Sequence, residues 1–170
     1  MKKHNGMRAH DIVILLKIIA KANEEWLMKD LAYELFISSS EVSESLNRSS
    51  YAGLIASDKK TVLRQALMEF LSNGIQYVFP QKPNGIVRGI VTAHSASPLN
   101  KIIQSNQNYV WAFVQGEQKG QAIEPLYKNA PKACLQDSKL YELLALVDAV
   151  RVGKVREKNI AIQELEKRIL

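Results

Sequence analysis

The stretch MKDLAYELFISSSEVSESLNRSSYAGLI, residues 28–55, decides the fold of this chain. Its apolar spacing predicts one short helix over residues 28–36 and a second over 39–52, which Gly53 ends. The connection between them, Ile37-Ser38, is tight. Because two short helices bury too little surface alone, we expect them to cross and share a small core. The positions that this core requires are Leu31, Ala32, Leu35, Ile37, Val42 and Leu46.

The second of these helices starts with a capping signal. Ser38 is followed three residues later by Glu41, which is the capping-box pattern. A serine cap lets the first turn face outward with free N–H groups, which can donate to a phosphate or to a base edge. The same helix carries Glu41 and Glu44, and phosphates would repel both carboxylates. The helix is therefore suited to fold formation more than to tight polyanion binding.

Further helices are predicted on both sides of this stretch. Apolar residues recur at helical spacing over residues 9–22 and 60–72, which flank the helix pair. Near the C-terminus the same spacing predicts a helix over 138–150, and a last helix is expected over about 158–170.

Between residues 74 and 126 the period changes to that of extended chain. Residues 75–79 and 86–91 flank a turn-rich segment that contains Asn84-Gly85, so they are expected to pair as a hairpin. Two further strands are expected over residues 109–114 and 121–125.

The core positions form a recognisable series: Leu31-Ala32, Ile37-Ser38, Val42-Ser43, Leu46-Asn47-Arg48 and Gly53-Leu54-Ile55. This series resembles the winged helix-turn-helix of MarR-like and related bacterial regulators, over residues 9–91. In that family a dimer inserts the second helix of the motif into the major groove, and a hairpin wing contacts the flanking backbone. The resemblance implies that the wing is the hairpin over 75–91. The helix over 60–72 departs from the simplest members, in which the motif leads straight into the wing.

The resemblance also implies which residues contact DNA. Lys82 and Arg88, in or beside the expected wing, would hold phosphates. The remaining contact residues would be Ser38 at the cap and the groove-facing Ser39, Ser40, Ser43, Asn47 and Arg48.

The expected architecture is α+β with two parts. Residues 1–92 would form the winged helix-turn-helix DNA-binding domain. Residues 93–170 would form a mixed α/β region with terminal helices that supports dimerisation or partner binding.

The net charge of +6 permits binding to a polyanion, and its distribution is uneven. Residues 1–74 carry ten Lys and Arg against nine Asp and Glu, whereas residues 75–136 carry six against two. The basic run 151–158 follows an apolar helix. It fits a second phosphate contact, the rim of a partner surface or a solvated helix face. The positive excess therefore lies outside the helix pair.

Several classes of protein and site are disfavoured. No apolar run reaches the roughly 20 residues that span a bilayer, and no signal cleavage site follows the N-terminus, so a cytoplasmic protein is expected. Cys134, the single cysteine, excludes an internal disulfide, and it is expected to be a buried or half-buried apolar residue and not a nucleophile. His94, Ser95 and Arg88 lack the partners of a metal site or a triad. We therefore expect no catalytic residue, metal or cofactor.

The sequence thus predicts a sequence-specific regulator of transcription that binds double-stranded DNA as a homodimer and is not an enzyme. The alternative is a winged-helix module that binds a protein partner. The layout of residues 75–156 also resembles bacterial regulators encoded beside nucleotidyltransferase-type toxins. In such pairs the winged-helix protein acts as antitoxin and autorepressor.

Overall fold

The computed structural model describes residues 5–170, which form an α+β fold of eight α-helices, two short 3-10 helices and one small sheet. The helices are α1 (Ala9–Lys21), α2 (Met28–Leu35), α3 (Ser39–Tyr51), α4 (Arg64–Asn73), α5 (Ile75–Val78), α6 (Ala130–Cys134), α7 (Ser138–Val152) and α8 (Val155–Ile169), with η1 (Ala93–Ser95) and η2 (Leu99–Lys101). The strands are β1 (Ile86–Val91), β2 (Tyr109–Ala112) and β3 (Gln118–Ala122).

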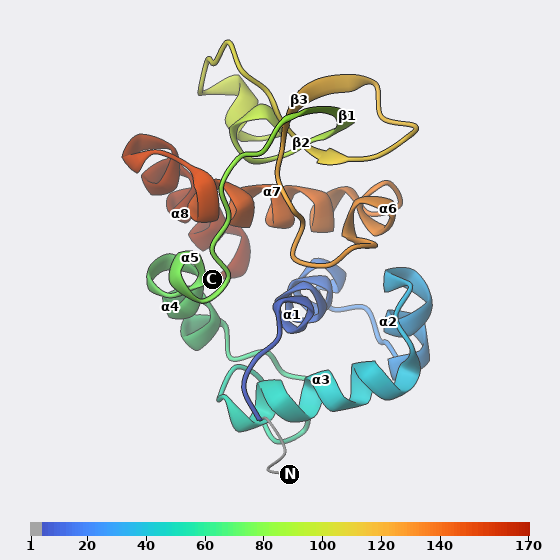
Figure 1. The fold of residues 1–170 in the computed structure, drawn as a ribbon. Helices are drawn as coiled ribbons and strands as arrows, with labels where there is room; N and C mark the ends of the chain where they lie inside the picture. Colours follow the sequence, from blue (N-terminus) through green and yellow to red (C-terminus); the bar gives the residue numbers. More distant parts are fainter. Residues whose placement is uncertain (1–4) are drawn as a thin grey trace.

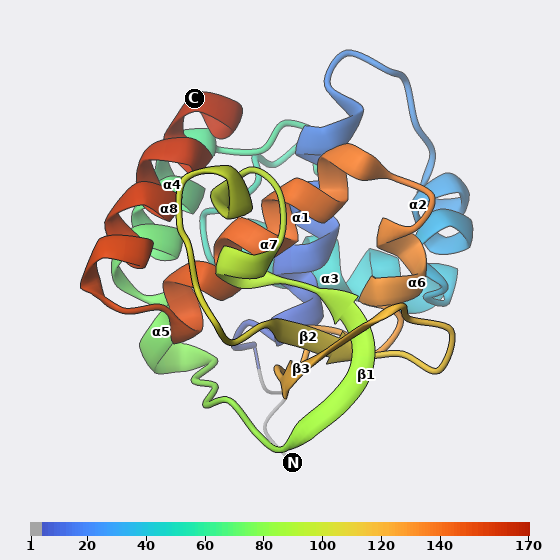
Figure 2. The same cartoon turned by 90° about the horizontal axis from the view of Figure 1, so that it is seen from above.

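Helix α1 is the centre of the molecule. It lies between α3 and α7, and the sheet lies beyond α7, at the opposite end from α3 (Figure 1). Helices α4, α5 and α8 line one flank of this stack, as the view from above shows (Figure 2). Every residue of α1 from Asp11 to Ala20 is buried, because neighbours cover the helix on all sides. One cluster of buried side chains runs from α1 to α8, so the described part of the first predicted domain, residues 5–92, shares a hydrophobic core with residues 93–170.

The sheet is a closed arrangement of three strands. β1 pairs antiparallel with both β2 and β3, while β2 and β3 pair in parallel with each other. Such tight closure requires a residue without a side chain on β1. A Cβ atom at Gly89 would lie 1.8 Å from the carbonyl oxygen of Trp111. Trp111 itself is buried in the core.

A buried carboxylate joins the sheet to α7. One oxygen of Asp148 accepts hydrogen bonds from Thr92 Oγ1 at 2.8 Å and Trp111 Nε1 at 2.6 Å, and the other accepts one from Arg151 Nη1 at 2.8 Å. Complete burial raises the pKa of Asp148, and these three donors act against that shift by favouring the charged form. Because both oxygens are satisfied, this contact fixes the sheet against the helix.

The structure contradicts the hairpin expected over residues 75–91. Residues Ile75–Val78 form the single helical turn α5, and β1 pairs with β2 and β3 instead. Ile75 is completely buried, α5 packs against α7, and Arg151 Nε donates to the carbonyl of Phe79 at 2.9 Å. These tertiary contacts override the strand preference of the local sequence.

The other predicted elements are present with shifted ends. Helix α4 begins at Arg64 rather than at residue 60, because the chain first makes a turn. Strand β3 begins at Gln118, three residues earlier than expected, and α6 was not predicted. Cys134 is buried, as expected, and desolvation raises the pKa of its thiol. Across residues 5–170 we find no helix with the length and apolar character needed to cross a membrane.

Candidate nucleic-acid interface

Helices α2 and α3 meet at the turn that the sequence predicts. Helix α2 ends at Leu35, and the Phe36 that caps it has a left-handed backbone with φ 56°. Ser38 Oγ accepts a hydrogen bond from the N–H of Glu41 at 3.2 Å, which confirms the serine cap of α3. Tyr127 donates its hydroxyl to the Phe36 carbonyl at 2.7 Å, so the segment after β3 also holds this turn. The start of α3 is therefore fixed from two sides.

The outer face of α3 carries small polar side chains. Their hydroxyl and amide groups can both donate and accept hydrogen bonds, as contacts to base edges require. Tyr51, 78% exposed, extends this face at the end of the helix. The predicted contact residues that the structure brings together here are Ser38, Ser39, Ser40 and Asn47, all exposed, and Ser43, which is half-buried.

A short turn beside this face was missed by the sequence analysis. Ile55 and Val62 form a β-bridge, and the chain reverses between them. The Thr61 hydroxyl donates to Asp58, as do the N–H groups of Thr61 and Lys60, and together they lower the pKa of Asp58 to about 2. The available signal was Asp58 itself, since aspartate commonly stabilises turns by accepting from the backbone that follows.

The turn brings two lysines next to α3. Lys59 adopts φ 55°, and its Nζ donates to Asn47 Oδ1 on the outer face of the helix. Lys60 follows and is also exposed. Over residues 5–170 neither lysine forms an ion pair with a carboxylate, so two cations adjoin the polar face.

Arg48 lies on the inner side of α3, which corrects its predicted place in the groove. Its side chain is only 9% exposed. Nε and Nη2 donate to the two oxygens of Asp11 at 2.9 and 2.7 Å, and Nη2 also donates to Glu41 at 2.6 Å. Hydrogen bonds from Arg48 to Asp11 raise the pKa of Arg48 above its already high ordinary value. The buried Asp11 carboxylate requires a cation, and Arg48 supplies it.

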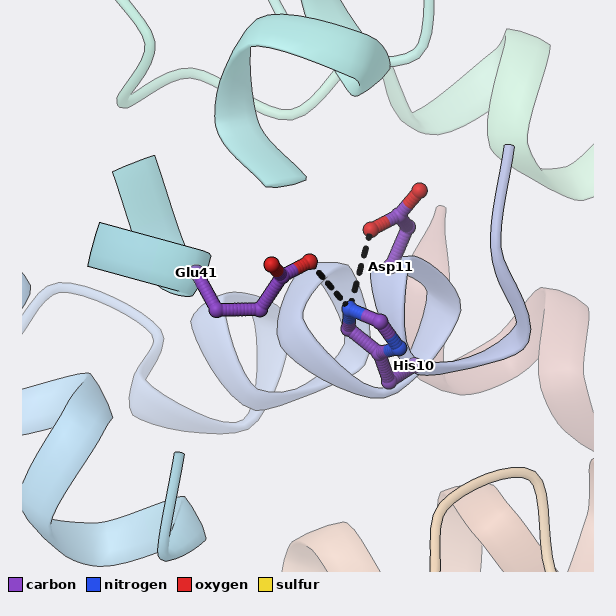
Figure 3. Close-up of side chains that lie close together, drawn as sticks. All are labelled: His10, Asp11 and Glu41. Atoms are coloured by element: carbon purple, nitrogen blue, oxygen red, sulfur yellow. Dashed lines mark hydrogen bonds and ion pairs between the residues drawn. The ribbon is translucent and has the colours of Figure 1, made fainter. Parts of the chain in front are cut away.

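Glu41 joins the same network instead of completing the capping box. His10, Asp11 and Glu41 point toward one another from α1 and α3 (Figure 3), with ligand atoms within 4.8 Å. These are metal-ligand residue types, but Arg48 Nη2 hydrogen-bonds both carboxylates and lies 3.3 Å from His10 Nε2. We call His10, Asp11, Glu41 and Arg48 the α1–α3 ion cluster. Its cation is the guanidinium, and its arrangement is that of a structural contact.

The pKa of Glu41 reflects this network. Burial raises it, but hydrogen bonds from Arg48 and His10 outweigh burial and hold the pKa below its ordinary value. The carboxylate that would repel phosphates is therefore already paired. The acidity of α3 matters less for an approaching polyanion than the sequence indicates.

Lys82 and Arg88 are not close to α3. Arg88 lies on β1, and Lys82 lies in the segment that joins α5 to β1. The sheet and α3 occupy opposite ends of the molecule, with α1 and α7 between them (Figure 1). The structure therefore separates Arg88 from the serines and Asn47 with which it was expected to act.

Comparison with protein-family models, with curated proteins and with solved structures finds no match to this chain.

Proposed function

We propose that residues 9–63 form a winged helix-turn-helix that binds double-stranded DNA, with α3 in the major groove. The observation that carries this proposal is the contact between Lys59, in the turn between Ile55 and Val62, and Asn47 on the exposed face of α3. A polar helix face with a basic turn beside it has the arrangement of a base-contacting helix and a phosphate-contacting wing. The wing is this turn, and not residues 75–91.

Each group in the proposed interface has a distinct role. Ser39 and Ser40 present their N–H groups at the start of α3, where a phosphate is favoured. Ser43 and Asn47 lie further along the helix and contact base edges. The amide group of asparagine is suited to the edge of adenine, with which it can form two hydrogen bonds. Lys59 and Lys60 hold the flanking phosphates. Arg48 makes no DNA contact.

The protein acts as a cytoplasmic transcriptional regulator. Two copies related by a twofold axis would place their α3 helices in successive major grooves, about 34 Å apart. Such a dimer would explain how a helix with few base contacts achieves specificity, since two half-sites contribute together.

The test is selection of bound sequences from a library of random duplexes, followed by affinity measurements on the selected and a scrambled duplex. Asn47→Ala should weaken binding to the selected duplex by about 1–3 kcal/mol and leave the scrambled duplex unchanged. Asn159→Ala is the matched control, because Asn159 is an exposed asparagine on α8. No enrichment of any sequence, or equal losses for the two variants, would refute the role of α3.

A second candidate is a protein-interaction module, including an antitoxin. The observation that favours it is the exposure of large apolar side chains around the same helices: Leu27 is 55% exposed, Met28 47% and Tyr33 82%. Exposed apolar groups close together commonly mark protein contacts. If the chain is a protein-interaction module, Tyr33→Ala should release a co-purifying partner. If it is the DNA-binding regulator proposed above, the same variant should keep its affinity for the selected duplex.

A further inference from the structure

The end of the molecule opposite α3 carries an excess of positive over negative charge. Residues 5–74, which hold α1 to α4, carry eight Lys and Arg against nine Asp and Glu. Residues 80–122, which hold the strands, η1, η2 and their loops, carry four against one. We call residues 80–122 the sheet end. A polyanion is therefore attracted to the sheet end more strongly than to the helix pair.

The cations of the sheet end have no carboxylate partner within residues 5–170. All four are exposed, and none of them forms an ion pair there: Lys82, Arg88, Lys101 and Lys119. Arg88 Nη1 donates instead to the Gly116 carbonyl at 3.4 Å. In the helical part Lys17, Lys21 and Arg48 are paired with carboxylates, whereas Lys59 and Lys60 beside α3 are not. Among residues 5–170 no ion pair offsets the positive charge of the sheet end.

Two of these cations face each other directly. Arg88 on β1 and Lys119 on β3 are partners in the antiparallel register, so their side chains leave the same face of the sheet. Like charges directly opposite each other destabilise a sheet. The next pair on this face, Ile86 and Gln121, brings no carboxylate. The arrangement is unfavourable by itself and becomes favourable when an anion lies between the two side chains.

We propose that the sheet end binds the phosphodiester backbone of a nucleic acid, independently of base sequence, with Arg88 and Lys119 at its centre. The four cations are spread over strands and loops, so they suit an extended row of phosphates more than one small anion. Three of the four are lysines, which are depleted at protein–protein contacts but common at phosphate contacts. The proposal goes beyond the role of α3, since the two surfaces lie at opposite ends of the molecule (Figure 1).

The basic corner between α7 and α8 extends the same surface. Lys154 and Arg156 are exposed there, and α8 packs against η2 of the sheet end. The loop that follows η2 passes from α8 to β2 (Figure 2). A nucleic-acid strand that crosses the sheet can therefore continue along the start of α8.

The experiment measures the affinity of the full chain for a random-sequence 30-base-pair duplex at several salt concentrations. Each phosphate contact contributes about 0.9 to the slope of log affinity against log salt. Arg88→Gln with Lys119→Gln should therefore reduce this slope by about 2 and weaken every duplex several-fold. The control is Lys139→Gln with Lys167→Gln, which removes the same charge at the first turn of α7 and the last turn of α8. The control should keep the slope of the unchanged protein.

A second variant separates charge from folding. Lys119→Glu places a carboxylate opposite Arg88, so the two side chains together carry no net charge. This variant should lower the salt slope as the double glutamine variant does, while its Tm stays equal to that of the unchanged protein or rises. An unchanged slope in both sheet variants would overturn the proposal. The proposal would also be overturned if the sheet variants lost binding to poly-glutamate but kept their binding to nucleic acid. The surface would then be one that binds an acidic protein. Asn47→Ala alters only the preference for the selected duplex, so failure of α3 as a reading helix is distinguishable from failure here.

Discussion

The guanidinium of Arg48 holds two carboxylates that differ in burial, Asp11 with a fully buried side chain and Glu41 with a side chain 30% exposed. A buried carboxylate that loses its cation keeps the cost of desolvation without the compensating attraction. We therefore expect the loss of Arg48 to lower the stability of the fold and not to remove a DNA contact.

At this residue Arg48→Met should lower the free energy of unfolding by about 3–5 kcal/mol, because Asp11 is then buried without a partner. Urea denaturation measures the loss. Adding Asp11→Ala to the same chain should recover part of it, since both charges are then absent. A loss of stability below about 1 kcal/mol, together with weakened specific DNA binding, would contradict this role and indicate that Arg48 contacts DNA in the groove.

At the scale of an element, the small sheet depends on close approach of its backbones. Three strands that each pair with both others leave little interior volume, and Gly89 lies where β1 meets the Trp111 carbonyl. The carboxylate of Asp148 then fixes this sheet to α7. The register of the three strands and the contact of the sheet with α7 therefore depend on each other.

Gly89→Ala should destabilise the protein by at least about 1–3 kcal/mol, because the added methyl group overlaps backbone that cannot move without breaking the strand pairing. Gly85→Ala is the control, since an added Cβ there meets no atom within 4 Å. The control should change stability by only a few tenths of a kcal/mol, in either direction. Equal shifts of the urea midpoint for the two variants would contradict the closed sheet.

For the whole molecule, ion pairs connect α1 to its neighbours. Lys17 of α1 lies 2.7 Å from Glu34 of α2 and 2.6 Å from Asp137, the cap of α7. Burial raises the pKa of both carboxylates, but hydrogen bonds and charge attraction to lysine outweigh it and hold both below their ordinary values. The contacts of α1 with α2 and α7 therefore contain carboxylates that are charged in the folded state.

Folding stability should consequently fall in acid. A carboxyl group whose pKa is lowered by folding stabilises the folded state at every pH above its pKa in the unfolded chain, which is 4.5 for glutamate and 3.8 for aspartate. This contribution is lost as the pH falls through the lower pKa of the folded state. Urea denaturation between pH 3 and 7 should show a plateau above about pH 5 and a decline below it. The Lys17→Met variant should show a shallower decline. A stability that rises on acidification would refute this linkage.

How much could be predicted from the sequence differs between elements. Helices α1, α2, α3 and α7 were predicted from apolar spacing, because that spacing is a local property that repeats along each helix. The Ser38 cap was predicted for the same reason, since the interacting groups are three residues apart. The turn at Asp58 was overlooked, although its signal is also local.

The sequence by itself therefore determined the helix pair, its cap, the excess of positive charge after residue 74 and the core positions of the pair, of which Ile37 alone is half-buried. Only the tertiary structure decided that Arg48 turns inward, that residues 75–78 are helical and that β1 pairs with β2 and β3 rather than with residues 75–79. It also decided that the charge excess lies at the far end from α3. The reason is that these features depend on contacts between distant segments, above all the burial of Asp11 and the packing of α5 on α7, which no local pattern encodes.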